Sequence, residues 1–330
     1  GGGTSGTLPL TVTGAGFHVT SGMIASMSAT VLAGDPVRQV VYAGLDAGDR
    51  AHPNSIVALD GANGRVLWSV PAHATPVTLA ISGDGQFLYF GTVADTAIYR
   101  VTIATSSISL VTHIVPGAGC SMVSHGIVVS PYDPHTIALE RHCSPVAIAF
   151  LGNVTIYDDS IPRQKIPPIT AQGMPLLAFG GSSSVMYGFG STTFLDVAVD
   201  ASGATVSGAI SGAAPAHGPD VLYLNGKLYT TNGIVYDPVA RAQLPALPGY
   251  LPDVTSIAAD AGGHVLYALT DDRQSLAAFD LTRGTFIGEV LIAGPVASRS
   301  HVVRWGTDGV AFISRTGVGD AEVYLIHTDL

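Results

Sequence analysis

Short apolar stretches recur along the whole chain, each one separated from the next by turn residues. The clearest group is PVTLAISGDG (76–85), QFLYFGT (86–92), AIYRVTI (97–103) and SISLVTHIV (107–115). Short runs rich in β-branched and aromatic residues, bounded by Gly, Asp, Ser or Thr, are typical of β-strands. The pattern predicts one four-stranded antiparallel sheet over residues 76–115.

The same pattern returns seven times, and each time one strand carries a tyrosine or a large apolar residue near its centre. These markers are Tyr42, Tyr89, Leu139, Tyr187, Tyr229, Tyr267 and Phe312, at intervals of 38 to 50 residues. A period of this length, with four strands in each repeat, is typical of a radial β repeat. The sequence therefore predicts an all-β fold, a seven-bladed β-propeller of four-stranded antiparallel blades. We assign residues 1–330 to this single domain, with residues 1–7 as a flexible N-terminal segment.

Three turns between predicted third and fourth strands share one pattern, in which Asp begins the turn and Gly ends it. They are Asp60–Gly64, Asp200–Gly203 and Asp280–Gly284. An Asp side chain accepts a hydrogen bond from a nearby backbone N–H, and Gly tolerates a positive φ. We interpret them as structural turns, because they lack the closely spaced oxygen ligands of a calcium loop.

The seventh repeat supplies only three strands, SHVVRWG, GVAFIS and EVYLI, before the chain ends. The segment LPLTVTG (8–14) reads as a strand but has no blade of its own. We expect it to close the ring as the missing outer strand of the last blade, because an open seam would leave unpaired strand edges. Deletion of residues 1–15 should then destabilise the last blade as well as the first.

Charge is scarce and unusual in kind. Charged residues make up 12% of the chain, with Lys only at 165 and 227 and Glu only at 140, 289 and 322. Because Lys and Glu favour exposed helix, we expect almost no helix. The net charge of −10 argues against a nucleic-acid partner. No apolar run is long enough to span a membrane, and the chain starts without an export signal, so we expect a mature or excised segment.

Several motifs resemble a known group of proteins. SIVALDGANGRVLWSV followed by PVTLAISGDGQFLYFGT resembles the repeat junction of the bacterial seven-bladed propellers of the YVTN and quinoprotein-like (WD40-like) superfamily. VTIYDDSIPRQ (154–164) and VVRWGTDGVAFIS (302–314) are similar to motifs of large secreted surface propellers. The resemblance implies an exported domain, located outside the cell or on its surface, often one module of a longer protein. It implies a binding or scaffolding role rather than a particular chemistry.

The two cysteines flank a predicted hairpin that turns near residues 131–132. In that register, directly opposed residues have numbers that sum to 263, as Cys120 and Cys143 do. Their Cβ atoms would then lie about 4.5–5.5 Å apart, slightly wide of disulfide geometry but within reach of small adjustments. A disulfide is favoured over two free buried thiols, and its role would be to staple a blade.

Catalytic and cofactor motifs are missing from the sequence. The eleven histidines show no metal-ligand spacing, although His125 and His301 fall on first strands, which line the central channel of a propeller. Whether they point to the axis depends on a register that is uncertain by one residue. Only Trp68 and Trp305 are present, whereas the propellers that bind pyrroloquinoline quinone carry Trp-rich motifs in every blade. We therefore expect no cofactor and no bound metal.

The loops between second and third strands hold much of the small supply of charge. Strands alternate in direction, so these loops share one face with the connections between blades. The candidate binding residues there are Asp49, Arg50, His52, Glu140, Arg141, His142, Asp271, Asp272 and Arg273. They either mark ordinary polar loops or form a face that binds a partner.

Two functions remain open. The first is a non-catalytic extracellular module that binds a protein or glycan, or copies of itself in a surface assembly. The second is a hydrolase of the propeller lactonase type, with acidic and His residues activating water at the channel mouth. Three or more carboxylates or imidazoles converging on the axis would favour the enzyme. The first strands read mainly Ser, Thr, Val, Ile and Ala, which favours the binding module.

Overall fold

The fold is known from a computed structural model of the chain. It describes residues 6–7, 10–13, 16–93, 96–114, 121–144, 152–166, 168–169, 176–189, 193–211, 220–250, 253–260, 262–271, 274–292, 298–315 and 321–330. These residues form strands and turns, and no helix occurs among them. No described segment is therefore a helix that could cross a membrane.

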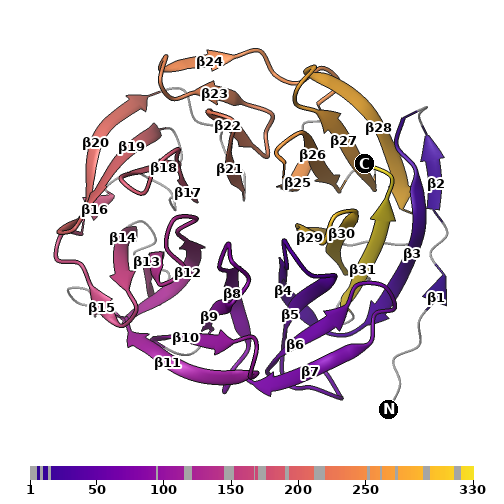
Figure 1. Cartoon of the computed structure of the whole chain (residues 1–330), viewed down its shortest axis with the longest axis horizontal. Coiled ribbons are helices and arrows are strands. Elements are labelled where there is room, and N and C mark those ends of the chain that lie inside the picture. The colour runs from indigo at the N-terminus through magenta and orange to yellow at the C-terminus, as the bar shows by residue number, and fades with distance from the viewer. Residues whose placement is uncertain are drawn as a thin grey trace.

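Seven sheets stand around a central channel, as Figure 1 shows. Blade 1 contains β4 (Ala29–Gly34), β5 (Val40–Leu45), β6 (Ser55–Asp60) and β7 (Val66–Pro71). Blade 2 contains β8 (Pro76–Ile81), β9 (Phe87–Thr92), β10 (Ala97–Thr102) and β11 (Ser107–His113). Blade 3 contains β12 (Ser121–Val129), β13 (Thr136–Ser144), β14 (Gly152–Asp158), β15 (Ile161–Pro162) and β16 (Pro168–Ile169).

The second half of the ring follows the same plan. Blade 4 contains β17 (Leu176–Phe179), β18 (Val185–Phe189), β19 (Thr193–Asp200) and β20 (Gly203–Ser211), and blade 5 contains β21 (Val221–Leu224), β22 (Lys227–Thr230), β23 (Val235–Asp237) and β24 (Ala242–Leu244). Blade 6 contains β25 (Val254–Ala259), β26 (Val265–Thr270), β27 (Ser275–Asp280) and β28 (Thr285–Ile292). Blade 7 contains β29 (Ser298–Trp305), β30 (Gly309–Arg315), β31 (Ala321–Thr328) and β3 (Val19–Ser26). The predicted seven-bladed all-β propeller is confirmed.

The ring closes with an N-terminal strand on the last blade, as predicted, but the strand is a different one. The outer strand of blade 7 is β3, which pairs with β31 from Val19↔Thr328 to Ser26↔Glu322. The strand β2 (Leu10–Thr13), which lies within the expected segment 8–14, adds instead to the outer edge of β28 in blade 6. The short β1 (Gly6–Thr7), within the segment expected to be flexible, pairs with β3. Deletion of residues 1–15 is therefore expected to weaken blades 6 and 7, not blade 1.

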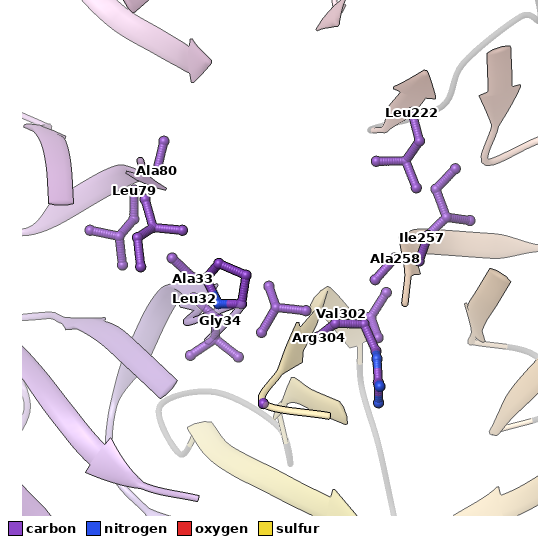
Figure 2. A pocket seen from close by; sticks show the side chains of 15 residues that line it. Leu32, Ala33, Gly34, Leu79, Ala80, Leu222, Ile257, Ala258, Val302 and Arg304 are labelled. Atoms are coloured by element: carbon purple, nitrogen blue, oxygen red, sulfur yellow. The ribbon is translucent and has the colours of Figure 1, made fainter. Parts of the chain in front are cut away.

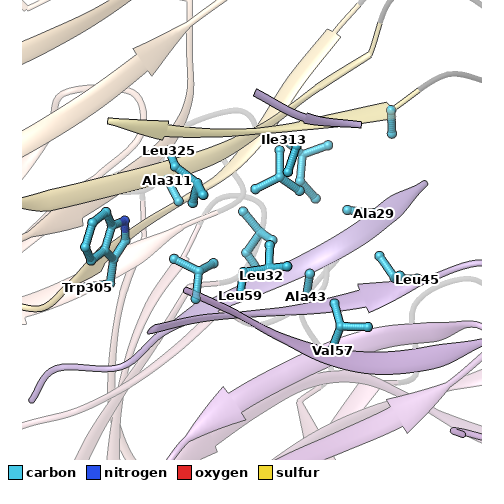
Figure 3. Close-up of a cluster of buried hydrophobic side chains, with 14 residues drawn as sticks. Ala29, Leu32, Ala43, Leu45, Val57, Leu59, Trp305, Ala311, Ile313 and Leu325 are labelled. Atoms are coloured by element: carbon cyan, nitrogen blue, oxygen red, sulfur yellow. The ribbon is translucent and has the colours of Figure 1, made fainter. Parts of the chain in front are cut away.

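The core lies between neighbouring blades, where the marker residues of the second strands are buried. Tyr42, Tyr89 and Tyr267 are at most 1% exposed, and the other four markers are buried as well. Figure 3 shows one such interface, in which Leu32 and Leu59 of blade 1 pack against Ala311 and Leu325 of blade 7, together with Trp305. The regular feature of the sequence thus specifies the contacts that hold the blades together.

The turns between third and fourth strands form as predicted. The Asp60 carboxylate accepts a hydrogen bond from the Ala62 N–H at 3.0 Å, and Asp200 and Asp280 accept equivalent bonds two residues ahead. Gly64, Gly203 and Gly284 all have positive φ. These contacts confirm the structural role of the three aspartates.

The hairpin of the two cysteines has a different register from the expected one. Met122, not Cys120, lies opposite Cys143, and Val129 lies opposite Ile137. The turn lies nearer to the C-terminus than predicted, and a bulge at Ser124/Gly126 adds one more residue to β12. The predicted register is therefore wrong. Cys120 itself and the side chain of Cys143 lie outside the described residues, so the disulfide is not tested.

Candidate functional site

The propeller has two faces, which we name by their loops. The connection face carries the loops between second and third strands, such as residues 46–54, and the links between blades. The turn face carries the turns between first and second strands, such as residues 82–86, and those between third and fourth strands. The predicted binding residues were assigned to the connection face.

Asp49, Arg50 and His52 lie in the predicted loop of blade 1. The Asp49 carboxylate organises this loop, because it accepts hydrogen bonds from the backbone N–H groups of Ser28, Ala51 and His52 at 2.8–3.1 Å. Arg50 is exposed, whereas Asp49 is buried. Asp271 lies in the corresponding turn of blade 6, and its neighbours 272 and 273, the predicted Asp272 and Arg273, lie outside the described residues.

Glu140, Arg141 and His142 do not lie in a loop, contrary to expectation. All three belong to β13, and Glu140 and Arg141 are 4% and 3% exposed. The prediction failed because three consecutive polar residues are typical of loops, while here the hairpin β12–β13 continues through them as a paired ladder. Burial lowers the pKa of Arg141. The side chain of His142 lies outside the described residues.

Glu140 is buried and forms an ion pair with the partly exposed His125 near the connection end of the channel. His125 occupies the bulge in β12, and its Nδ1 lies 3.2 Å from Glu140 Oε1. A Cβ at Gly126 would lie 2.8 Å from Glu140 Oε2, so a larger residue at this position would require the carboxylate to move. Burial raises the pKa of Glu140, and the neighbouring carboxylate raises the pKa of His125. Sequence reasoning placed His125 on a first strand correctly but did not find its partner.

His301 occupies the corresponding bulge in blade 7. It lies between the paired residues Ser300 and Val303 of β29 and has a positive φ of 56°. Burial, with the Arg315 charge as a second cause, lowers the pKa of His301 to about 4. This imidazole is therefore neutral at pH 7, and its environment differs from that of His125.

Hydroxyl groups tie neighbouring first strands together near the connection end. The Thr30 hydroxyl donates to the Pro76 carbonyl at 2.6 Å, and the Thr78 and Ser124 hydroxyls lie 3.2 Å apart. The Ser256 hydroxyl donates to Asp220 at 2.5 Å. These polar groups are used in contacts between blades. Within the described part of the chain, no three His, Cys, Asp or Glu residues gather as a metal-binding group.

The turn end of the channel contains a cavity of about 350 Å³. First-strand residues of blades 1, 2, 5, 6 and 7 line it, and Figure 2 shows their side chains around the opening. Leu79 and Leu222 are its larger, partly exposed apolar side chains, whereas Leu32, Ile257 and Val302 are at most 4% exposed and pack between blades.

Arg304 is the one ionisable side chain in the described lining of this cavity. Its guanidinium donates to the carbonyls of Thr307 and Gly309, both at 2.7 Å, and lies 5.1 Å from the centre of the Tyr267 ring. The guanidinium is thus held by the protein itself. The cavity offers an apolar surface without a base or a nucleophile among these residues.

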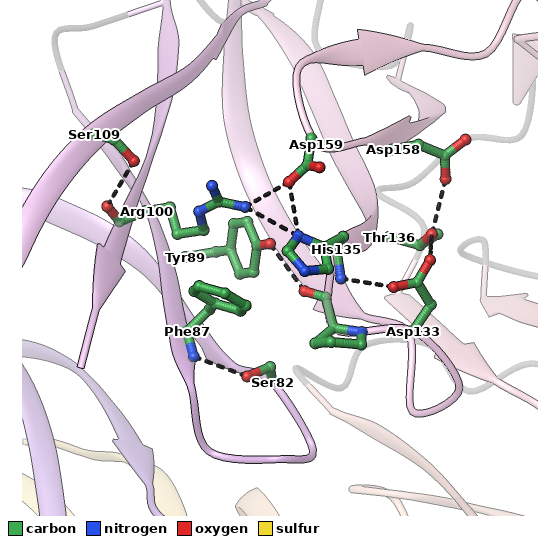
Figure 4. A network of polar contacts seen from close by, with 11 residues as sticks. Ser82, Phe87, Tyr89, Arg100, Ser109, Asp133, His135, Thr136, Asp158 and Asp159 are labelled. Carbon is green, nitrogen blue, oxygen red and sulfur yellow. Dashed lines mark hydrogen bonds and ion pairs between the residues drawn. The ribbon is translucent and has the colours of Figure 1, made fainter. Parts of the chain in front are cut away.

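A network of polar side chains lies on the same turn face, in blades 2 and 3. Figure 4 shows its centre, where Asp159 accepts hydrogen bonds from Arg100 at 2.5 Å and from His135 at 2.8 Å. The Arg100 guanidinium lies over the Phe87 ring at 4.7 Å, and the His135 ring packs against Phe87 as well. Burial acts to raise the pKa of Asp159, but the hydrogen bonds and charges of His135 and Arg100 outweigh it and lower this pKa overall.

The polar network continues into blade 4. The Thr136 hydroxyl lies within hydrogen-bonding distance of the Asp133 and Asp158 carboxylates, and Arg163 donates to both carboxylate oxygens of Asp158 at 2.7 and 2.8 Å. Arg163 also donates to the Asp200 carbonyl. Sequence reasoning missed this network, because its members come from separate turns. The one available signal was the concentration of charge in DDSIPRQK (158–165).

Comparisons with known proteins agree with the fold. No family model matches the chain, and no curated protein matches its sequence. Among solved structures, the chain is similar to Kuenenia stuttgartiensis hydrazine synthase, with a TM-score of 0.67 and 15% identity over 92% of this chain and 96% of that one. It is also similar to the β-propeller domain of Myceliophteria thermophila Cps50 (Swd1), with a TM-score of 0.62 and 10% identity over 91% and 98% of the two chains. At these identities the similarity establishes the propeller fold alone.

Proposed function

We propose that this propeller is a non-catalytic binding or scaffolding module, and that its turn face receives an apolar side chain of a partner protein in the axial cavity. The observation that carries the proposal is the lining of that cavity. First-strand residues of five blades surround a volume of about 350 Å³, and Leu79 and Leu222 are its partly exposed large aliphatic side chains. This volume is at the lower end of the range of small-ligand pockets and suits one or two large side chains.

The chemistry near the channel supports binding rather than hydrolysis. General acid–base catalysis needs an ionisable group within hydrogen-bonding reach of the substrate. Near the axis, Arg304 and the pair His125–Glu140 are instead engaged in contacts with their own protein. The alternative function is a propeller hydrolase, which a measurement of lactone or ester hydrolysis would distinguish from a binding module.

A protein partner fits the cavity better than a glycan. Burial of a sugar hydroxyl costs free energy unless it gains a hydrogen bond, and aliphatic walls offer none. Burial of an apolar side chain contributes about 1.5–3 kcal/mol. The polar network of Arg100, His135 and Asp159 lies on the same face, so an apolar centre would be accompanied by a polar rim.

A selection of linear peptides that bind the full chain tests the proposal. We expect the enriched peptides to share one large apolar residue, and we expect Leu79→Glu to weaken their binding at least about tenfold, because a carboxylate would then occupy the cavity wall. Val239→Glu is the matched control, since Val239 is 86% exposed on blade 5 and does not line the cavity. Circular dichroism would verify that both variants fold.

Two results would contradict the proposal. Peptide binding that Leu79→Glu leaves unchanged would place the interaction elsewhere. Lactone or ester hydrolysis by the wild-type chain, lost in Glu140→Gln, would establish the hydrolase.

Its proposed setting follows from the sequence resemblance. Membership of the YVTN and quinoprotein-like superfamily and an extracellular or cell-surface location are supported by the motifs SIVALDGANGRVLWSV and VVRWGTDGVAFIS. Immunogold labelling of intact native cells would test the location. Label confined to the cytoplasm of sectioned cells would contradict it.

A further inference from the structure

The outer strands of blades 1, 4 and 6 share one local geometry. Each contains a bulge, at Leu67, Ser207 and Ile287 respectively, followed by four regularly paired residues. The paired segments are residues 68–71, 208–211 and 288–291, and each ends opposite the first residue of the third strand. Pro71, Ser211 and Leu291 are therefore equivalent positions.

The direction of the backbone groups at these positions follows from strand alternation. The N–H of Ile292 donates inward to the Gln274 carbonyl, and the N–H of Ala72 donates inward to Asn54. Because backbone N–H groups alternate in direction along a strand, the N–H of Leu291 points outward, away from the blade. The nitrogen of Pro71 faces outward in the same way but carries no hydrogen. The register of blade 4 places the N–H of Ser211 outward in the same way.

The chain treats the three edges differently. In blade 6, β2 pairs with the outward edge of β28, from Leu10↔Ile292 to Thr13↔Glu289. In blade 1, Pro71 removes the outward donor, which is a known way to protect a strand edge. In blade 4, residues 208–211 contain neither proline nor charge, and no described strand pairs with their outer side.

We propose that the outer edge of blade 4, Gly208–Ser211, accepts an extended strand, and that its occupant is residues 10–13 of a second copy of this chain. The segment Leu10–Thr13 already pairs with Glu289–Ile292 of blade 6, which overlaps the equivalent edge there by three residues. It is uncharged and rich in β-branched residues, as an added strand prefers to be. The inference does not depend on the axial cavity, which is formed by first strands.

The geometry also determines the kind of assembly. In Figure 1, β2 lies outside β28, while β20 lies on a different sector of the rim. Donor and acceptor are thus different surfaces, so the contact is head-to-tail and produces open chains unless the rotation closes a ring. The copy that supplies residues 10–13 must release them from its own β28, so the number of strand pairings does not change. Association is therefore expected to be weak and to require a high protein concentration.

A labelled peptide with the sequence of residues 8–14, LPLTVTG, tests the acceptor on the full chain. In a fluorescence-anisotropy titration, we expect a binding stoichiometry of one peptide per chain. Ser211→Pro gives blade 4 a proline at the position equivalent to Pro71 of blade 1. It should weaken peptide binding about tenfold or more, because the outward N–H donor is lost. Pro71→Ser is the reciprocal variant, and it should raise the stoichiometry from one peptide to two.

Sedimentation velocity over a concentration series tests the occupant. The wild type should associate as its concentration rises, and Ser211→Pro should remain monomeric. The proposal is overturned if the peptide binds Ser211→Pro as well as the wild type, which would indicate displacement of β2 from blade 6. It is also overturned if the wild type stays monomeric at every concentration. The peptide-binding test with Leu79→Glu concerns the axial cavity, so its result does not depend on either outcome for the edge of blade 4.

Discussion

The two ends of the central channel differ in the kinds of side chains that surround them. At the connection end, ionisable groups lie buried or partly buried among the blades, as in the pair His125–Glu140 and at His301. At the turn end, aliphatic side chains surround an open volume, while charged groups form a network farther out. The difference indicates that polar residues near the axis contribute to contacts between blades, and it is the basis for proposing the apolar end as the binding surface.

Trp305 provides the largest expected effect at the turn end. Its side chain is fully buried between blades 7 and 1, and a Cβ at Gly309 would lie 2.1 Å from its ring, so the packing is very close. Trp305→Ala should reduce the free energy of unfolding by about 3–5 kcal/mol, because a large cavity remains. Urea unfolding measures this loss. Trp68→Ala, on the partly exposed outer strand of blade 1, is the control and should cost less than half as much.

His301 tests the connection end through the pH dependence of stability. Its folded pKa of about 4 lies below the unfolded value of about 6.5, so stability is full above pH 6.5 and falls as the pH drops toward 4. We expect this group to account for about 2 kcal/mol of that loss, allowing for partial exposure. His301→Asn retains a residue that tolerates positive φ and should flatten the acid side of the profile. An unchanged profile would show that His301 titrates in contact with water.

Glu140 is expected to affect stability less than His301, and the pH dependence of its contribution has the opposite sign. The pKa values of both Glu140 and His125 are raised in the folded state, so their contribution is complete at low pH and is lost as the pH rises. Glu140→Gln should reduce stability by about 1 kcal/mol at pH 5.5, where His125 is charged, and by less at pH 8. Thermal unfolding at the two pH values measures the difference. Glu322→Gln on β31 controls for the loss of a carboxylate, and equal effects of the two substitutions would contradict a specific pair.

The smallest expected effect is at the turn-face network. Asp159 is 55% exposed, and exposed ion pairs contribute roughly 0–1 kcal/mol. Asp159→Asn should reduce stability by about 0.5 kcal/mol at low salt and by less at high salt, because salt screens the pair with Arg100. Thermal unfolding in about 0.05 M and about 0.5 M NaCl measures the difference. A salt-independent loss well above about 1 kcal/mol would show that the network is structural.

The blades were predictable because their second and third strands are buried on both sides and therefore consist of apolar runs such as FLYFGT and VLYALT. The closing strand β3 was not predictable, because it lies at the rim of the propeller and has several exposed residues. Its sequence, VTSGMIAS, shows no regular alternation of apolar and polar residues. The strand β2 has the stronger pattern, yet it is the additional fifth strand of blade 6.

The sites were less predictable than the fold. A charged triplet normally indicates a loop, and only the three-dimensional pairing shows that Glu140 and Arg141 are buried in β13. The network of Arg100, His135 and Asp159 joins two blades, and the apolar cavity joins five, so neither leaves a local pattern. The binding role of Asp49, Arg50, His52 and Asp271 stays a prediction.

Methyl NMR of the full chain with a selected peptide tests the central claim most directly. The proposal predicts chemical-shift changes for the methyl groups of Leu79, Leu222 and Ile257, which line the cavity. Leu45 and Leu269, which lie toward the connection end of their strands, should remain unchanged. Shifts at Leu45 and Leu269 without shifts at the cavity would contradict the assignment of the binding surface to the turn face.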